Sequence, residues 1–367
     1  MMKINRLLFI LPRLTGGGAE RVTSVFCNTL SENGYDIHLI LYERGKDEYP
    51  CSDKVKVHVL PQRQNNELRA IYILQKFLYL RKLIKSISPD CIIPMLPYQV
   101  EHCFLATVGL HYPMVITVRN DPLHDTPNER MRKRRDWIAK HVYGVFVQTE
   151  SQKKYFPLEV QKKTFIVPNP VNQEALTYIS EEKKEILHFV AAGRLEKQKN
   201  YEMMISAFEM AYQNNKGIRL DIYGSGTLYD SLMTLIQEKS LIGIVRLCGR
   251  VVDIISIMSK YDAFLMSSNY EGMPNSLMEA MGLGLPCVST DCCAGSSELI
   301  GDNKRGILVG VDDVKSMTMA IESLCKNPKY AFSLGREARK YMKMNYADIK
   351  ISKRLIEELE NLQIHGR

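Results

Sequence analysis

The sequence has no run of about 18 apolar residues, which is the length that a membrane-spanning helix needs. The apolar run at residues 7–11 is also too short for the core of a signal peptide. The nine cysteines show no paired spacing: Cys292 and Cys293 are adjacent, and the others are scattered. This pattern offers neither a disulfide framework nor a zinc site, and it favours a reducing cytosol.

Other absences narrow the class of protein. The chain has no repeat, low-complexity segment, zinc-finger, RNP-like or helix-turn-helix pattern, so only its charge suggests nucleic acid. It has no Asp-x-Asp motif to hold a divalent ion, and we expect neither a metal nor another cofactor. Hydrophobic residues make up 45% of the chain and charged residues 25%, as is ordinary for a globular enzyme.

Short apolar runs alternate with helix-like stretches along all 367 residues. The alternation predicts parallel sheets with right-handed crossovers, and the length predicts two doubly wound domains of the α/β class. The expected strands are residues 7–11, 37–41, 55–59, 91–95, 115–118, 142–148, 187–191, 220–223, 245–248, 263–266, 286–290 and 306–309. Two prolines in the segment 167–172 make it the natural hinge, because proline cannot continue a helix or a central strand. We expect domains of residues 1–172 and 173–348.

The most informative stretch is residues 271–279, with Glu271 and Glu279 at its ends. It follows an apolar strand-like run and leads into an apolar helix-like run, which is the usual α/β ligand-binding junction. Pro274 suits the first helical turn, where the amides of residues 275–277 can face an anion. The two carboxylates can hold hydroxyls at two depths of one site. The alternative is a pair of solvated glutamates beside a core helix.

A second segment, residues 192–200, follows the strand-like run 187–191 and contains Arg194 and Lys199. A guanidinium and an ammonium that converge on a diphosphate can neutralise its charge without a metal. The alternative is a basic surface loop.

A third segment, residues 13–21, contains three consecutive glycines just after the first strand. Gly16 and Gly17 would let the backbone approach a phosphate or a sugar closely. These glycines do not follow the G-x-G-x-x-G spacing of dinucleotide-binding folds. Glu43, at the end of the next strand, could nevertheless bind a ribose, so a nicotinamide-dependent oxidoreductase stays an alternative.

Together the three segments resemble the motifs of the retaining, nucleotide-sugar-dependent glycosyltransferases of family 4, which have the GT-B fold. The string of residues 270–288 carries the E-x7-E signature of that family. Residues 193–199 fit its Gly-Arg-Leu segment with a lysine five positions after the arginine. The resemblance implies two Rossmann-like domains that face each other across a cleft. It also implies that a last helix, about residues 349–367, crosses back onto the first domain.

The resemblance implies a role for each motif residue. Glu271 would hold the donor sugar, and Arg194 and Lys199 would stabilise the departing diphosphate, so these three are the expected catalytic residues. Glu279 would hold the ribose. Residues 224–226 would line the rim of the site or form a plain tight turn. The other expected donor-binding residues are Gly16, Gly17, Gly249, Arg250, Gly272, Met273, Pro274, Asn275, Ser276 and Leu277.

The first domain would bind the acceptor. Many family members have a histidine after the fifth strand of this domain, whereas this chain has Arg119, Asn120 and Asp121 there. The Arg-Asn-Asp-Pro segment resembles the segment found at this place in family members that build capsule, exopolysaccharide and O-antigen repeats. Those enzymes often transfer sugars onto polyprenyl-diphosphate-linked sugars. We expect these three residues to bind the acceptor. The alternative is a capped strand end with a turn.

The excess of positive over negative charge lies in the first half of the chain. Residues 1–172 carry a formal net charge of +9, and the remainder carries −1. Two basic stretches stand out in the first half. Residues 68–85, with interleaved apolar side chains, suit an anionic membrane surface, and residues 130–135, ahead of Trp137, could meet lipid phosphates or an acceptor diphosphate. Each stretch also fits a solvated basic face. We favour the membrane, and expect a cytoplasmic protein at the cytoplasmic face of the inner membrane.

The expected reaction is transfer of a hexose or N-acetylhexosamine, with retained configuration, from a nucleoside-diphosphate sugar to a glycan hydroxyl. We expect a UDP-linked donor and a polyprenyl-diphosphate-linked acceptor, with a soluble glycan as the other possible acceptor. Two alternatives share the fold: a nucleotide-sugar epimerase and a non-catalytic nucleotide-sugar-binding module. An epimerase should carry carboxylates and histidines placed for proton abstraction, and a binding module has no reason to keep Glu271.

Overall fold

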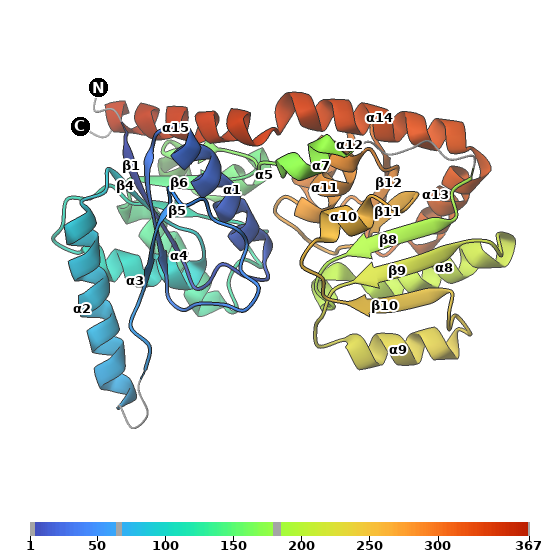
Figure 1. Ribbon diagram of the computed structural model, residues 1–367, viewed down its shortest axis with the longest axis horizontal. Coiled ribbons are helices and arrows are strands. Elements are labelled where there is room, and N and C mark those ends of the chain that lie inside the picture. The colour runs from blue at the N-terminus through green and yellow to red at the C-terminus, as the bar shows by residue number, and fades with distance from the viewer. Residues whose placement is uncertain (1–3, 64–67, 179–184, 366–367) are drawn as a thin grey trace. The chain divides into compact units, whose positions relative to one another are not determined.

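The computed structural model describes residues 4–63, 68–178 and 185–365. The chain divides into two compact units (Figure 1). Unit 1 spans the residues up to Pro170 together with those from Asp348 onward, and unit 2 is Val171–Ala347. Each unit is built of parallel strands and helices, so the α/β class and the two doubly wound domains expected from the sequence are confirmed.

Unit 1 contains strands that all pair in parallel. They are β1 (Arg6–Leu11), β2 (Asp36–Leu41), β3 (Lys56–Val59), β4 (Cys91–Pro94), β5 (Val115–Thr117), β6 (Gly144–Val147) and β7 (Thr164–Ile166). Their orders are β3-β2-β1-β4 and β5-β6-β7, and a parallel bridge between Ile92 and Met114 links the two sets. The helices are α1 (Gly18–Glu32), α2 (Arg69–Ile87), α3 (Pro97–Thr107), α4 (Glu129–His141), α5 (Glu150–Tyr155), α6 (Leu158–Gln161) and α15 (Asp348–His365).

The C-terminal helix α15 belongs to unit 1. At its first residue, Asp348 Oδ2 accepts a hydrogen bond from Thr29 Oγ1 of α1 at 3.4 Å. Further along, Glu360 Oε1 accepts from the Ile4 amide at 3.4 Å. The Leu362 side chain lies so close to Gly144 that a Cβ there would be 2.5 Å from Leu362 Cδ1. The last helix is therefore part of the structure that supports the unit 1 sheet.

Unit 2 contains one parallel sheet in the order β10-β9-β8-β11-β12-β13. The strands are β8 (His188–Ala192), β9 (Arg219–Tyr223), β10 (Val245–Gly249), β11 (Ala263–Met266), β12 (Cys287–Thr290) and β13 (Ile307–Val309). The order reverses between β8 and β11, which makes their carboxyl ends the topological switch point of the sheet. The helices are α7 (Gln173–Thr177), α8 (Tyr201–Asn214), α9 (Tyr229–Glu238), α10 (Ile254–Met258), α11 (Asn275–Leu283), α12 (Ala294–Ile300), α13 (Val314–Lys326) and α14 (Pro328–Asn345).

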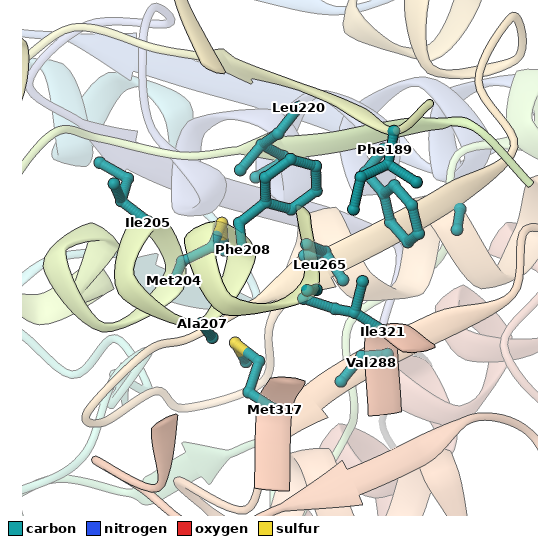
Figure 2. Close-up of a cluster of buried hydrophobic side chains, with 14 of the residues drawn as sticks. Phe189, Met204, Ile205, Ala207, Phe208, Leu220, Leu265, Val288, Met317 and Ile321 are labelled. Atoms are coloured by element: carbon teal, nitrogen blue, oxygen red, sulfur yellow. The ribbon is translucent and has the colours of Figure 1, made fainter. Parts of the chain in front are cut away.

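The core of unit 2 lies between the sheet and helices α8 and α13 (Figure 2). Phe189 of β8 meets Phe208 of α8 edge to face, with ring centroids 5.7 Å apart. Strands of this sheet are near-continuous apolar runs because both faces of a parallel sheet are buried. All twelve strands expected from the sequence are confirmed, and most of them are apolar runs of this kind. The additional strand β7 was not predicted, because it has three residues and begins at a threonine.

Candidate functional site

The residues expected to bind the donor in unit 2 come together at one edge of its sheet. Arg194 and Lys199 follow β8, Gly249 ends β10, and Glu271 follows β11. Because all strands are parallel, their carboxyl ends lie at the same edge. Strands β8 and β11 are hydrogen-bonded neighbours at the switch point, the usual ligand position in such sheets.

Lys199 and Glu271 form an ion pair at this point. Lys199 Nζ lies 2.5 Å from Glu271 Oε1, and the two side chains are 15% and 11% exposed. Ser268 Oγ donates to the same carboxylate oxygen at 2.8 Å. The pair is therefore held in one geometry, close to the surface but mostly shielded from water.

Gln198 joins this pair to Arg194. The Gln198 amide nitrogen donates to Glu271 Oε2 at 3.3 Å and to the Tyr270 carbonyl at 2.9 Å. Its oxygen accepts from Arg194 Nη2 at 3.0 Å. The three catalytic candidates thus lie in one hydrogen-bonded network with buried Gln198 at its centre. Gln198 and Ser268 were not predicted as site residues. The only feature of the sequence that points to them is that each is a polar residue close to a predicted site residue.

Glycines shape the loop that carries Arg194 and Lys199. A Cβ at Gly193 would lie 2.9 Å from Lys199 Cε, so a larger residue would push the lysine away. Gly224 has φ +151°, and a Cβ there would lie 1.8 Å from the Gly193 carbonyl oxygen. The Leu195 amide donates to the Ser225 carbonyl at 3.0 Å. The turn at residues 224–226 therefore packs against the backbone of residues 193–195 and supports this loop.

Helix α11 begins one residue later than the sequence predicts. Pro274 is the N-cap residue and α11 begins at Asn275, whereas Pro274 was expected inside the first turn. The first bond within the helix runs from the Met278 amide to the Pro274 carbonyl at 3.1 Å. The amides of Ser276 and Leu277 precede that bond and point toward the N-terminal end of the helix.

Glu279 lies in the second turn of α11 and is 5% exposed. Gly272, Met273 and Pro274 are buried. A Cβ at Gly295 of α12 would lie 2.8 Å from the Gly272 carbonyl oxygen, so the two backbones pack directly on each other. Arg250 is exposed directly after Gly249, which has φ +72° and accepts from the Gly224 amide at 2.9 Å.

Gly16 and Gly17 belong to unit 1, at the N-terminal end of α1. Gly16 has φ +88°, a conformation that favours glycine, and Gly17 is the N-cap residue. Glu43, which the oxidoreductase alternative needs for a ribose, lies 3.7 Å from Arg13 Nη1 in an exposed ion pair.

The three acceptor candidates follow β5 in unit 1. Arg119 donates through Nη2 to Asn169 Oδ1 and lies over the Phe146 ring, 4.9 Å from its centroid. Its Nε and Nη1 are buried without a hydrogen-bond partner. Burial lowers the pKa of the Arg119 guanidinium to about 9.

Asn120 and Asp121 have local roles in the loop that follows. Asp121 Oδ1 accepts from the Leu123 amide at 2.8 Å and lies 3.0 Å from His124 Nδ1. The Asn120 carbonyl accepts from Gln152 Nε2 at 2.9 Å. These contacts form a turn after the strand end, as expected if Asn120 and Asp121 have only a structural role. The Asp121 side chain is 34% exposed.

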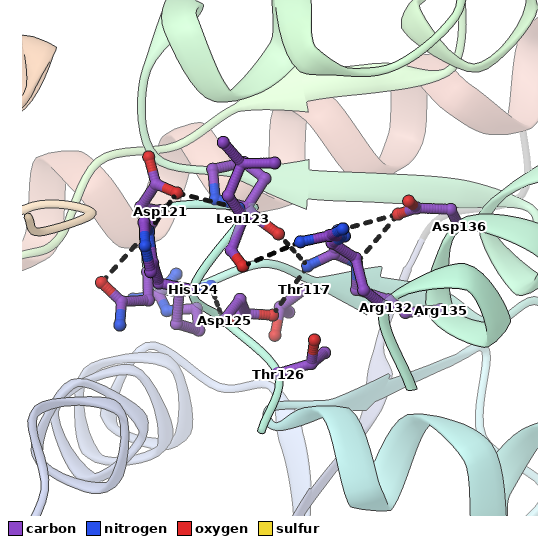
Figure 3. A network of polar contacts seen from close by, with 12 residues as sticks. Thr117, Asp121, Leu123, His124, Asp125, Thr126, Arg132, Arg135 and Asp136 are labelled. Carbon is purple, nitrogen blue, oxygen red and sulfur yellow. Dashed lines mark hydrogen bonds and ion pairs between the residues drawn. The ribbon is translucent and has the colours of Figure 1, made fainter. Parts of the chain in front are cut away.

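Arg135 departs from the expected exposed basic stretch at residues 130–135. It is 1% exposed and lies between Asp125 and Asp136, at 3.3 and 2.8 Å (Figure 3). Burial raises the pKa of the Asp125 carboxyl to about 6. Arg135 is therefore a structural residue of unit 1, and the exposed cations of this stretch are Arg130, Lys133 and Arg134.

Among the described residues, no cluster of three or more His, Cys, Asp or Glu side chains could hold a metal ion.

Comparisons with known proteins show the family and the fold of the chain. Residues 173–341 match the family described as Glycosyl transferases group 1, and residues 16–175 match Glycosyltransferase Family 4. Two similar proteins come from Campylobacter jejuni. The N-acetylgalactosamine-N,N'-diacetylbacillosaminyl-diphospho-undecaprenol 4-alpha-N-acetylgalactosaminyltransferase is 31% identical, over 89% of this chain and 92% of its own. The GalNAc-alpha-(1->4)-GalNAc-alpha-(1->3)-diNAcBac-PP-undecaprenol alpha-1,4-N-acetyl-D-galactosaminyltransferase is 28% identical, over 98% of this chain and 100% of its own.

A solved structure shows the same fold over the whole chain. HepE of Anabaena, in complex with UDP and glucose, superposes with a TM-score of 0.82 over 97% of this chain and 99% of its own. The sequence identity is 15%, so this likeness concerns the fold alone.

Proposed function

The chain belongs to glycosyltransferase family 4, a family of retaining enzymes, and from this premise we propose that it transfers an N-acetylhexosamine or a hexose from a UDP-linked donor to a polyprenyl-diphosphate-linked glycan. The observation that carries the proposal is the network of Arg194, Gln198, Lys199 and Glu271 at the switch point of unit 2. The acceptor class is supported by the names of the two Campylobacter relatives. The product would serve capsule, exopolysaccharide or O-antigen synthesis.

In the proposed mechanism, Glu271 accepts a hydrogen bond from a hydroxyl of the donor sugar. Lys199, which compensates the Glu271 charge in the unliganded chain, also faces the incoming diphosphate. As the bond between sugar and phosphate breaks, Lys199 and Arg194 stabilise the negative charge that grows on the leaving group. The amides of Ser276 and Leu277 add positive potential from the helix N-terminus.

No protein nucleophile is assigned in this reaction. The departing phosphate oxygen takes the proton of the acceptor hydroxyl, and that hydroxyl oxygen forms the new bond on the same face of the sugar. The protein contributes positioning and charge stabilisation. We assign donor binding to unit 2 with Glu279 on the ribose, and acceptor binding to Arg119, Asn120 and Asp121 of unit 1.

A donor panel tests this function. The purified enzyme is incubated with membrane lipid extract and with radiolabelled UDP-GalNAc, UDP-GlcNAc, UDP-glucose or GDP-mannose. We expect label to enter the lipid phase from a UDP-sugar only, and the Glu271→Gln variant to lose that transfer. Label that stays in free sugar or nucleotide with every donor, with or without the extract, would contradict the proposal.

We also propose that helix α2 holds the enzyme at an anionic membrane. None of the described helices is long and apolar enough to cross a bilayer. Figure 1 shows α2 along one side of unit 1. Its buried residues, Leu80, Ile84 and Ile87, belong to the core side. Ile71, Leu74 and Leu78 are 47%, 58% and 54% exposed.

The exposed apolar residues and two lysines form one stripe along α2. Lys82 and Lys85 are exposed and continue the spacing of three and four residues that begins at Ile71. Arg81 is not part of this stripe, because its Nη1 donates to the Ala106 and Val108 carbonyls at 2.7 and 2.8 Å. A stripe of this composition suits the headgroup region of a bilayer with anionic lipid.

Reversing the charge of Lys82 and Lys85 together should weaken binding to vesicles of anionic phospholipid by roughly 30-fold or more. Each basic residue near such a surface contributes on the order of 1 kcal/mol, and salt screens the effect. Sedimentation with vesicles measures the change. The control is Lys304→Glu with Lys315→Glu, two exposed lysines of unit 2. Equal sedimentation of all three proteins would show that the stripe is only a solvated face.

A further inference from the structure

Arg119 and Arg135 are two arginines of unit 1 with opposite electrostatic surroundings. Arg135 is neutralised by Asp125 and Asp136, at 3.3 and 2.8 Å. Among the described residues, no ion pair includes Arg119. The nearby carboxylate of Asp125 pairs with Arg135, and toward Arg119 it accepts a hydrogen bond from the backbone amide, at 3.3 Å.

The groups that do touch the Arg119 guanidinium orient it without neutralising it. Asn169 Oδ1 accepts from Arg119 Nη2 and, at 2.7 Å, from Gln148 Nε2. The ring of Phe146 lies under the guanidinium carbon. Nε and Nη1 are shielded from water and have no acceptor. A buried cation of this kind is costly, and the lowered pKa of Arg119 has the same cause.

The position of this cation is the usual ligand edge of an α/β sheet. Arg119 follows β5, Gln148 follows β6, and Asn169 lies a few residues after β7. The three strands are parallel neighbours, so these side chains gather at their carboxyl ends. Gln148 and Asn169 are each 2% exposed and fix the direction of the guanidinium.

We propose that Arg119 is the receptor for an oxyanion of the acceptor, a phosphate or a carboxylate close to the sugar that is extended. The anion accepts hydrogen bonds from Nε and Nη1 and supplies the negative charge that compensates the guanidinium. A water-excluded contact of this kind is strong, because the local dielectric is low. Entry requires a local opening of the segments around Arg119. That the oxyanion belongs to an acceptor rests on the proposed function; that Arg119 binds one does not.

The first test is the thermal stability of the full chain. Arg119→Met removes an uncompensated charge and keeps much of the volume, so the Tm of the unliganded protein should rise by about 2–4 °C. Arg135→Met is the matched control. It leaves Asp125 and Asp136 without their cation, so its Tm should fall. A fall of similar size in Arg119→Met would show that Arg119 is a structural residue and would overturn the proposal.

The second test adds anions in the presence of saturating UDP, which occupies the proposed diphosphate site of unit 2. Inorganic pyrophosphate or glucuronate should raise the Tm of the wild type, but not that of Arg119→Met. Arg119→Lys should keep part of the gain, because the charge is retained. A gain with pyrophosphate identifies a phosphate acceptor, and a gain with glucuronate alone identifies an acidic sugar. No gain with either anion, or an equal gain in Arg119→Met, would overturn the proposal.

A kinetic measurement separates this proposal from the proposed function. In the transfer assay, Arg119→Met should raise the KM for the acceptor about tenfold or more and leave the KM for the donor unchanged. If no acceptor supports transfer but the anion gain in Tm depends on Arg119, the proposed acceptor is wrong and the oxyanion site stands. If transfer proceeds and the acceptor KM is unaffected, the oxyanion site is wrong.

Discussion

Replacing Lys199 with alanine should lower turnover by roughly two to three orders of magnitude, which is the usual cost of losing a preorganised charge-stabilising group. The structure adds a reason for a large effect. Lys199 is the cation that compensates Glu271, at 2.5 Å and mostly shielded from water. Without it, the Glu271 carboxylate would face the incoming diphosphate and repel it. Arg194→Ala should lower turnover on the same scale, because Arg194 is linked to the same network through Gln198.

A double-mutant cycle with Glu271→Gln separates the two roles of Lys199. Because the alanine variant leaves Glu271 uncompensated, the double variant should bind UDP more tightly than Lys199→Ala alone. Turnover should stay low in both. Calorimetric titration of UDP and steady-state kinetics measure the two quantities. Additive effects on UDP affinity would contradict the coupling. Transfer that requires Mg²⁺ or Mn²⁺ and is abolished by a chelator would contradict the assigned role of Lys199 and Arg194.

The sequence predicts that Arg194, Lys199 and Glu271 gather at one sheet edge of unit 2, and the structure places them there, while their roles in donor binding stay predictions. Strand β11, the turn at Gly272 and helix α11 each carry a local signal, and parallel topology brings their neighbours to the same edge. Lys199 and Glu271 could be assigned to one site on these grounds. Their direct contact could not, because it depends on which strands pair in the sheet. The choice of β8 and β11 as neighbours is a property of the whole fold.

The acceptor side could be predicted only in outline, because its chemistry depends on burial. Arg119 and Arg135 are the same residue type, each in a polar stretch of the sequence. One is neutralised by two carboxylates, and the other is held by an amide and an aromatic ring. Which carboxylate reaches which arginine is decided by the path of residues 120–128, and no periodic pattern describes such a loop. Arg81 is a further case, since its sequence context suits lipid while its side chain binds backbone carbonyls.

Replacing Glu279 with alanine should weaken UDP binding about 10-fold to 100-fold. A hydrogen bond to a charged group contributes roughly 1.5–3 kcal/mol, and the proposed partners of Glu279 are the ribose hydroxyls. Glu279 lies on α11 with 5% exposure, so its carboxylate is in a desolvated position where such bonds are strong. Calorimetric titration of UDP measures the change. The control is Glu238→Ala, an exposed glutamate of the same unit that should leave UDP affinity unchanged.

Changing the ribose of the nucleotide together with Glu279 tests whether Glu279 binds the ribose hydroxyls. A UDP analogue that lacks both ribose hydroxyls should bind the wild type about as weakly as UDP binds Glu279→Ala. It should bind the variant and the wild type equally, because the lost contact involves the same atoms from both sides. Thermal unfolding of the unliganded variant shows whether a general loss of structure contributes. If the analogue still distinguishes wild type from Glu279→Ala by the full factor, Glu279 acts on another part of the donor or only supports α11, and the ribose assignment is wrong.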